Sequence, residues 1–119
     1  MSQPVQRGDV FMANLDPTIG VEIKKRRPVV VLSNNVINQY SRLVIVVPLT
    51  TNISRLSPSH ILIPMGEGGL SQNSKPLTEQ IRAMDKQRLT SKIGQLSHRF
   101  LRLIEQAIRN SLWTGGVRS

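Results

Sequence analysis

The amino-acid sequence excludes several kinds of chemistry through what it lacks. Its 119 residues include no cysteine, which rules out a disulfide scaffold, a thiol nucleophile and a thiolate metal site. Only two histidines are present, His60 and His98, so no metal site and no metal cofactor are expected. Aromatic residues make up 3% of the chain, which argues against extensive stacking of nucleic-acid bases on aromatic rings. No apolar run approaches the length of a membrane span.

Acidic residues are also scarce. Sixteen lysines and arginines face seven aspartates and glutamates, and the net charge is +9. This excess on a small protein indicates a polyanionic partner, with nucleic acid ahead of a membrane surface. The first seven residues lack the apolar core of a signal peptide, so we expect a cytoplasmic protein. The length predicts a single domain spanning residues 1–119.

The hydrophobic pattern predicts short strands followed by one long helix. Strands are expected at residues 10–15, 28–32, 43–49, 60–64 and 76–81, then a helical turn at 85–89, a short strand around Ile93 and a helix from His98 to Leu112 capped by Ser97. This pattern predicts an α+β, mainly β domain. Its architecture is a small, strongly bent antiparallel sheet or barrel with a C-terminal helix.

The strongest local feature is a run of four cations, Lys24, Lys25, Arg26 and Arg27, directly before Pro28. Four adjacent cations repel one another, so they are either solvated or face an anion. A solvated loop is the simpler interpretation. However, the run leads into a predicted buried strand, which should hold at least Arg27 rigidly, and a rigid guanidinium can bind two phosphate oxygens at once.

Hydroxyl and amide side chains end the second predicted buried strand, at Thr50, Thr51 and Asn52. Such residues most often bond only the backbone of the following turn. If the two buried strands are antiparallel neighbours, however, Arg27 at the start of one and Thr50 at the end of the other converge. An arginine beside a hydroxyl would suit a phosphate under nucleophilic attack.

A third polar segment contains Glu79, Gln80 and Arg82. A carboxylate near cations stays ionised and can accept a proton, although Glu79 and Arg82 can equally form a structural ion pair. RNA cleavage without metal uses the 2′-hydroxyl of the substrate as nucleophile. The protein then supplies a base, a cation for the crowded phosphate and a donor to the leaving oxygen. These three polar segments contain all of these groups.

Taken together, the motifs resemble the MazF/PemK/Kid family of toxin ribonucleases. The matching segments occur in the same order along nearly the whole chain: Arg7–Val10, Leu15–Glu22, Arg27–Ser33, Val46–Thr51 and Leu77–Leu89.

The resemblance implies an SH3-like barrel that works as a homodimer and is the toxin of a type II toxin–antitoxin pair. Family members cut single-stranded mRNA without metal, leaving a 2′,3′-cyclic phosphate and a 5′-hydroxyl, and are restrained by an acidic antitoxin. By motif, the family's catalytic arginine and threonine fall on Arg27 and Thr50, with Glu79 as the candidate base. The expected RNA-binding residues are Glu22, Lys24, Lys25, Arg26, Thr51, Asn52, Gln80 and Arg82.

Two alternatives remain open at this level. A related toxin class of the same fold binds DNA gyrase without catalysis, and Trp113 with the glycines after it faintly resembles the tail of that class. The other alternative is a non-catalytic RNA-binding barrel that uses the same cations.

Overall fold

An antiparallel sheet organises the chain in the computed structural model, which describes residues 4–15, 26–55 and 61–112. Within these residues, the strands are β1 (Asp9–Asn14), β2 (Arg26–Val31), β3 (Leu43–Thr50), β4 (Lys75–Pro76), β5 (Arg82–Asp85) and β6 (Leu89–Gln95). The α-helices are α1 (Asn35–Tyr40) and α2 (His98–Leu112), and the short 3-10 helices are η1 (Glu67–Gly69), η2 (Thr78–Gln80) and η3 (Lys86–Arg88).

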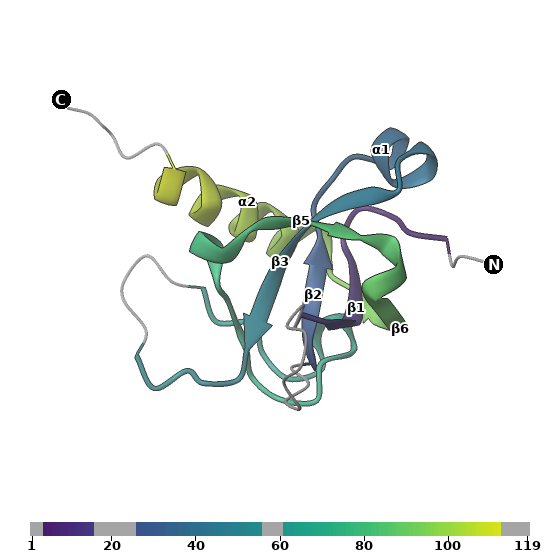
Figure 1. The fold of residues 1–119 in the computed structure, drawn as a ribbon. Coiled ribbons are helices and arrows are strands. Elements are labelled where there is room, and N and C mark those ends of the chain that lie inside the picture. Colours follow the sequence, from purple (N-terminus) through teal and green to yellow (C-terminus); the bar gives the residue numbers. More distant parts are fainter. Residues whose placement is uncertain (1–3, 16–25, 56–60, 113–119) are drawn as a thin grey trace, which may run out of the picture.

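The strands follow the order β4-β3-β2-β1-β6, and β5 pairs with another part of β3. All of these pairings are antiparallel. The sheet is strongly bent but does not close into a complete barrel. Figure 1 shows α1 and α2 toward the end of the sheet opposite the tip of β3. None of the helices in the described part of the chain is both long enough and apolar enough to cross a membrane.

The core has two parts because side chains alternate between the two faces of each strand. Val30 of β2 and Val47 of β3 belong to the part that packs against Ile104 and Ile108 of α2. The neighbouring Val29, Val31 and Val46 belong to the second part, which also contains Phe11 and Met84. β2 and β3 are therefore buried on both faces, as their continuous apolar runs predict.

Most of the predicted elements are confirmed. Strands β1, β2, β3 and β6 and the turn η3 occur where the sequence indicates them, and α2 has the predicted bounds. Ser97 precedes α2 as expected. Its carbonyl accepts the first helical hydrogen bond from Leu101, and its N–H donates to the Glu67 carboxylate at 2.7 Å.

Two predicted strands were wrong, and the elements α1 and β5 were not predicted. The strand expected at residues 76–81 is replaced by β4 and η2, because the chain turns back after Leu77 with a hydrogen bond from the Gln80 N–H to the Leu77 carbonyl. The strand expected at 60–64 is only a bridge between Ile63 and Ser74, and His60 lies outside the described residues. The helix α1 was not predicted. Asn34 caps it by accepting a hydrogen bond from the Ile37 N–H at 3.0 Å.

A glycine contact fixes η1 against β6 and supplies a test of this fold. At Gly69, an added Cβ would lie 1.9 Å from the Ile93 carbonyl oxygen, whereas at Gly66 it would meet nothing within 4 Å. Both glycines have positive φ angles, 78° and 98°.

We therefore expect Gly66→Ala to lower the free energy of unfolding by about 1–2 kcal/mol, the cost of a left-handed conformation. Gly69→Ala should cost clearly more, because backbone must also move apart. Urea unfolding of both variants measures the difference. Equal losses would show that the close contact between η1 and β6 is absent in solution.

Candidate active site

The pairing of β2 with β3 brings together the two residues that the sequence suggests as a catalytic pair. The strands are antiparallel, and Val29 lies opposite Pro48. Two residues farther along the same register, Arg27 is opposite Thr50. Because the separation is two residues on each strand, Arg27 and Thr50 project from the same face of the sheet as Val29 and Pro48. The expected convergence of the two strand ends is therefore confirmed.

Both residues line a surface hollow of about 500 Å³ at this end of the sheet. Its described lining residues are Arg26, Arg27, Pro28, Leu49, Thr50, Thr51 and Asn52. Two of these residues are cationic and none is acidic, so the hollow favours an anion over a cation or a neutral ligand.

The Arg27 side chain is half-buried and makes no hydrogen bond or ion pair with another described residue. The backbone of β2 fixes its position, and Pro28 follows immediately. Arginine carries five N–H donors in a rigid plane and stays protonated in proteins. Arg27 is therefore a positioned cation whose donors are not used by any other described residue.

The Thr50 hydroxyl accepts a hydrogen bond from the Asn52 N–H at 3.1 Å. This bond stabilises the turn after β3, as expected for a hydroxyl that bonds the backbone of the following turn. It uses the oxygen of the hydroxyl as an acceptor but leaves its proton free to be donated. Thr50 can thus shape the turn and donate to a ligand oxygen at the same time.

The neighbouring lining residues differ in how firmly they are held. Arg26 donates from Nη2 to the Thr90 Oγ1 at 3.0 Å, so its guanidinium is anchored on β6. The Asn52 Oδ1 accepts from the Ser54 hydroxyl at 2.9 Å, which orders the turn after β3. Thr51 is exposed.

The structure does not bring Glu79, Gln80 or Arg82 into the lining of this hollow. Glu79 and Gln80 are exposed on η2, which follows the edge of β3 that faces away from β2. Thr78, between Leu77 and Glu79, turns toward α2 and shares a hydrogen bond with Ser111. Arg82 is exposed on β5 opposite Val46. The expected proximity of Glu79 to the catalytic pair is therefore not found, because the chain is a 3-10 turn there and not a strand.

Glu22, Lys24 and Lys25 lie outside the described residues. Their expected part in RNA binding stays a prediction from the sequence. Within the described ranges, no group of three or more histidines and carboxylates is placed to hold a metal ion.

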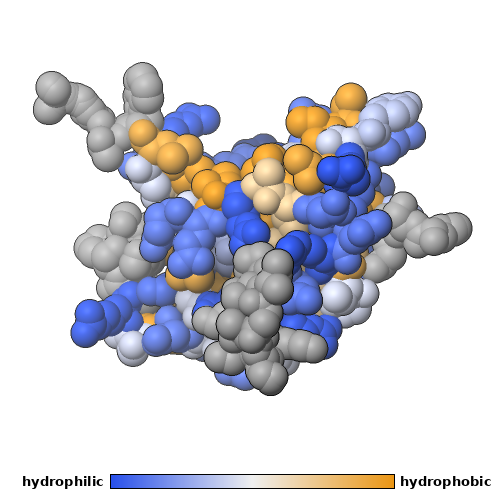
Figure 2. Space-filling model, viewed as in Figure 1, coloured by the Kyte–Doolittle hydropathy of each residue, from blue (hydrophilic) through white to orange (hydrophobic). Residues whose placement is uncertain are grey.

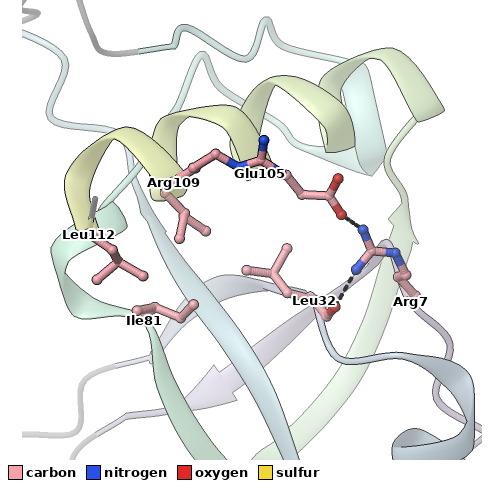
Figure 3. Close-up of a pocket in the computed structure, with 7 residues that line it drawn as sticks. Arg7, Leu32, Ile81, Glu105, Arg109 and Leu112 are labelled. Atoms are coloured by element: carbon pink, nitrogen blue, oxygen red, sulfur yellow. Dashed lines mark hydrogen bonds and ion pairs between the residues drawn. The ribbon is translucent and has the colours of Figure 1, made fainter. Parts of the chain in front are cut away.

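Two further hollows that bear on function were not predicted from the sequence. One is an apolar groove of about 560 Å³ between α2 and the core, shown in Figure 3, where Arg7 pairs with Glu105. The sequence of α2 partly indicated this groove, because Leu112 extends the apolar stripe of the helix beyond its buried residues. The other lies on the far side of Arg26, where Asn14 meets Arg88. No sequence signal for it exists, since its residues are about 75 positions apart.

Comparison with known proteins identifies the family. Residues 6–112 match the family described as PemK-like, MazF-like toxin of type II toxin–antitoxin system. An endoribonuclease EndoA of Bacillus subtilis is 39% identical over 109 residues, covering 91% of this chain and 94% of the relative. An endoribonuclease MazF of Staphylococcus saprophyticus is 39% identical over 116 residues, covering 97% of each chain.

Solved structures agree on the fold. In a crystal structure of a MazE–MazF complex from Deinococcus radiodurans, the similar chain has a TM-score of 0.79 at 22% identity, covering 95% of this chain and 99% of that one. The fold, the order of the motifs and these relatives lead to one conclusion: the chain belongs to the PemK-like, MazF-like toxins of type II toxin–antitoxin systems.

Proposed function

We propose that this protein is a toxin endoribonuclease that cuts single-stranded mRNA at specific sequences without a metal ion. The observation that carries the proposal is the convergence of Arg27 and Thr50 in a hollow whose described lining residues include two cations and no acid. The relatives named as endoribonucleases support the activity. Cutting mRNA would inhibit translation and growth, as a toxin of this family is expected to do.

The proposed reaction is an internal phosphoryl transfer in the RNA. The 2′-hydroxyl gives up its proton and its oxygen attacks the adjacent phosphorus, while the bond from phosphorus to the 5′-oxygen of the next nucleotide breaks. The leaving oxygen takes up a proton and becomes a 5′-hydroxyl, and the other end is a 2′,3′-cyclic phosphate. Arg27 stabilises the charge on the phosphate oxygens, and the Thr50 hydroxyl donates a hydrogen bond to the same group.

The other proposed contacts follow from position. Arg26, Thr51 and Asn52 line the hollow and are assigned to the RNA on either side of the cut. Gln80 and Arg82 are outside the lining and would contact RNA farther from the cut. The sequence names Glu79 as the candidate base, whereas its position on η2, separated from Arg27 by the width of β3, favours a role away from the proton transfer.

The partners and setting are also part of the proposal. An acidic antitoxin would cover the cationic hollow, since charge complementarity favours it. The D. radiodurans complex supports a partner of this kind, because it is a complex of MazE with MazF. We place the protein in the cytoplasm, where its substrate is found, and treat residues 1–119 as a single domain.

We further propose a homodimer formed through the apolar groove beside α2. Leu32, Ile81, Ile108 and Leu112 supply its apolar lining, with polar atoms contributing little. Leu112 is 69% exposed in the isolated chain, which is costly for a leucine unless another surface covers it. Figure 2 shows an apolar saddle across this end of the molecule. A second copy placed on the saddle would bury the groove, as the family's dimers lead us to expect.

The catalytic pair is tested by cleavage of a long single-stranded RNA in the presence of EDTA, with the cut ends mapped. Arg27→Ala and Thr50→Val should each lower the rate by about 100-fold, because each removes a group that stabilises the transition state. Arg102→Ala, an equal charge change on the outer face of α2, serves as the control. Cutting that persists in Arg27→Ala would contradict the assignment, and binding without cutting by the wild-type protein would favour the RNA-binding alternative.

The role of Glu79 is tested by Glu79→Gln in the same assay. Because Glu79 is exposed and outside the hollow, we expect a loss of less than about tenfold, typical of a screened charge at a distance. A loss as large as that of Arg27→Ala, with a changed pH profile of kcat, would instead identify Glu79 as the base.

The dimer is tested by sedimentation equilibrium of Leu112→Glu. A carboxylate in the apolar groove should weaken the dimer by about 100-fold, because its burial has no compensating partner. Leu103→Glu is the matched control, since Leu103 is exposed on α2 but does not line the groove. Equal dimerisation of the two variants would place the interface elsewhere.

A further inference from the structure

A second polar hollow, of about 480 Å³, lies beside the proposed active site. Its lining comes from the end of β1 (Asn14), from the end of β5 (Asp85), from η3 (Gln87 and Arg88) and from the start of β6 (Thr90). β5, η3 and β6 are consecutive in the chain, whereas β1 is distant in sequence and adjoins them in the bent sheet, where Ala13 of β1 pairs with Leu89 of β6.

Arg26 connects this second hollow to the first one. It lines the hollow that contains Arg27 and Thr50, and its guanidinium bonds to Thr90 of the second hollow. In the sheet, Arg26 lies directly opposite Asn14, which also lines the second hollow. Thr90 is itself fixed by donating to the Met12 carbonyl at 3.0 Å. Arg26 is therefore a rigid cation on the boundary between the two hollows.

The second hollow can also receive an anion, because Arg26 at its boundary adds a cation to Arg88. Asp85 is the one acid among its described lining residues, and that carboxylate is already paired with the Arg42 Nε at 3.1 Å and with the Gln87 N–H at 2.9 Å. Arg88 is half-buried and held by a hydrogen bond from Nη1 to the Asn14 carbonyl at 3.1 Å. A single bond leaves most of its five N–H donors for a ligand.

Amide groups supply a second kind of recognition here. The Gln87 side chain is exposed and bonds to no other described residue, so both its donor and its acceptor are available. The Oδ1 of Asn14 is buried without a hydrogen-bond partner, which is unfavourable within the described structure. A rotation of this amide toward the hollow would let it accept a hydrogen bond from a ligand amino group.

We propose that the second hollow is a subsite for the nucleotide that flanks the cut phosphate, and that Gln87 is a specificity-determining residue. Arg26 and Arg88 bind the phosphate of that nucleotide. The Gln87 amide reads the edge of its base, and a base with an exocyclic amino group also pairs with Asn14. This inference rests on the proposed function, because the flanking nucleotide is placed by the phosphate held between Arg27 and Thr50.

The test measures base preference at every position around the cut, by sequencing the ends that wild-type and variant proteins produce from a randomised single-stranded RNA. Gln87→Ala should reduce discrimination at one flanking position by about fivefold or more, the range of a lost amide–base pair, and leave the other positions unaltered. Gln39→Ala removes an exposed amide on α1, outside both hollows, and should change no preference. Unaltered preferences at every position in Gln87→Ala would overturn the inference.

A second measurement uses Arg88→Gln, which keeps a donor for the Asn14 carbonyl but removes the charge. It should raise KM more than it lowers kcat. The salt dependence of binding to a non-cleavable 2′-deoxy oligonucleotide should become shallower by about 0.7 in the log–log slope, the value for one phosphate contact on a single strand. An unchanged slope would overturn the phosphate contact.

The experiments distinguish a failure of the proposed activity from a failure of the proposed subsite. If the wild-type protein cuts no RNA, the proposed activity is wrong, and the oligonucleotide slope still decides whether Arg88 contacts a phosphate. If Arg27→Ala loses cutting while Gln87→Ala and Arg88→Gln match the wild-type protein, the activity stands and the subsite is wrong.

Discussion

The antiparallel register of β2 and β3 is the constraint on which the site depends. It places Val29 opposite Pro48 and, by continuation, Arg27 opposite Thr50 on one face of the sheet. A shift of one residue would turn Arg27 to the other face and remove the pair. The register is held by burial on both sides, since Val30 and Val47 pack under α2 while Val31 and Val46 pack into the second part of the core. The packing of valines thus sets the position of a charged group several residues away.

The positions of the acidic side chains also affect the charge of the site. Among the described residues, Asp9 pairs with Lys92, Asp85 with Arg42 and Glu105 with Arg7, and Glu67 accepts the N–H of Ser97. Four of the described carboxylates thus join elements, while Glu79 is exposed on η2. Arg26 and Arg27 lie at the end of the sheet, and none of the described residues that line their hollow is acidic. The pairing of these four acids elsewhere adds to the positive potential of the site.

The sequence was sufficient to predict those elements for which one physical signal dominates. Continuous β-branched runs identified β2 and β3, and the periodic stripe of α2 gave its bounds, so the meeting of Arg27 and Thr50 could be inferred before the structure. The sequence predictions failed where a backbone turn determines the local structure. The alternation of residues 76–81 imitates a strand, but η2 interrupts it and carries Glu79 away from the pair. The hollow beyond Arg26 depends on the bend of the sheet, which brings Asn14 to Arg88 and has no local sequence pattern.

The two faces of the sheet contribute differently to the apolar groove and to the cationic hollow. The face of the sheet that packs toward α2 borders the apolar groove, which Ile81, Ile108 and Leu112 line. Arg27 and Thr50 project from the opposite face into the cationic hollow, which is also lined by Leu49 from the core part beneath α2. The valine register of β2 and β3 supports both surfaces, since Val30 and Val47 pack beneath α2 and the same pairing sets Arg27 opposite Thr50. A substitution that shifted this register would therefore disturb the apolar groove and the cationic hollow together.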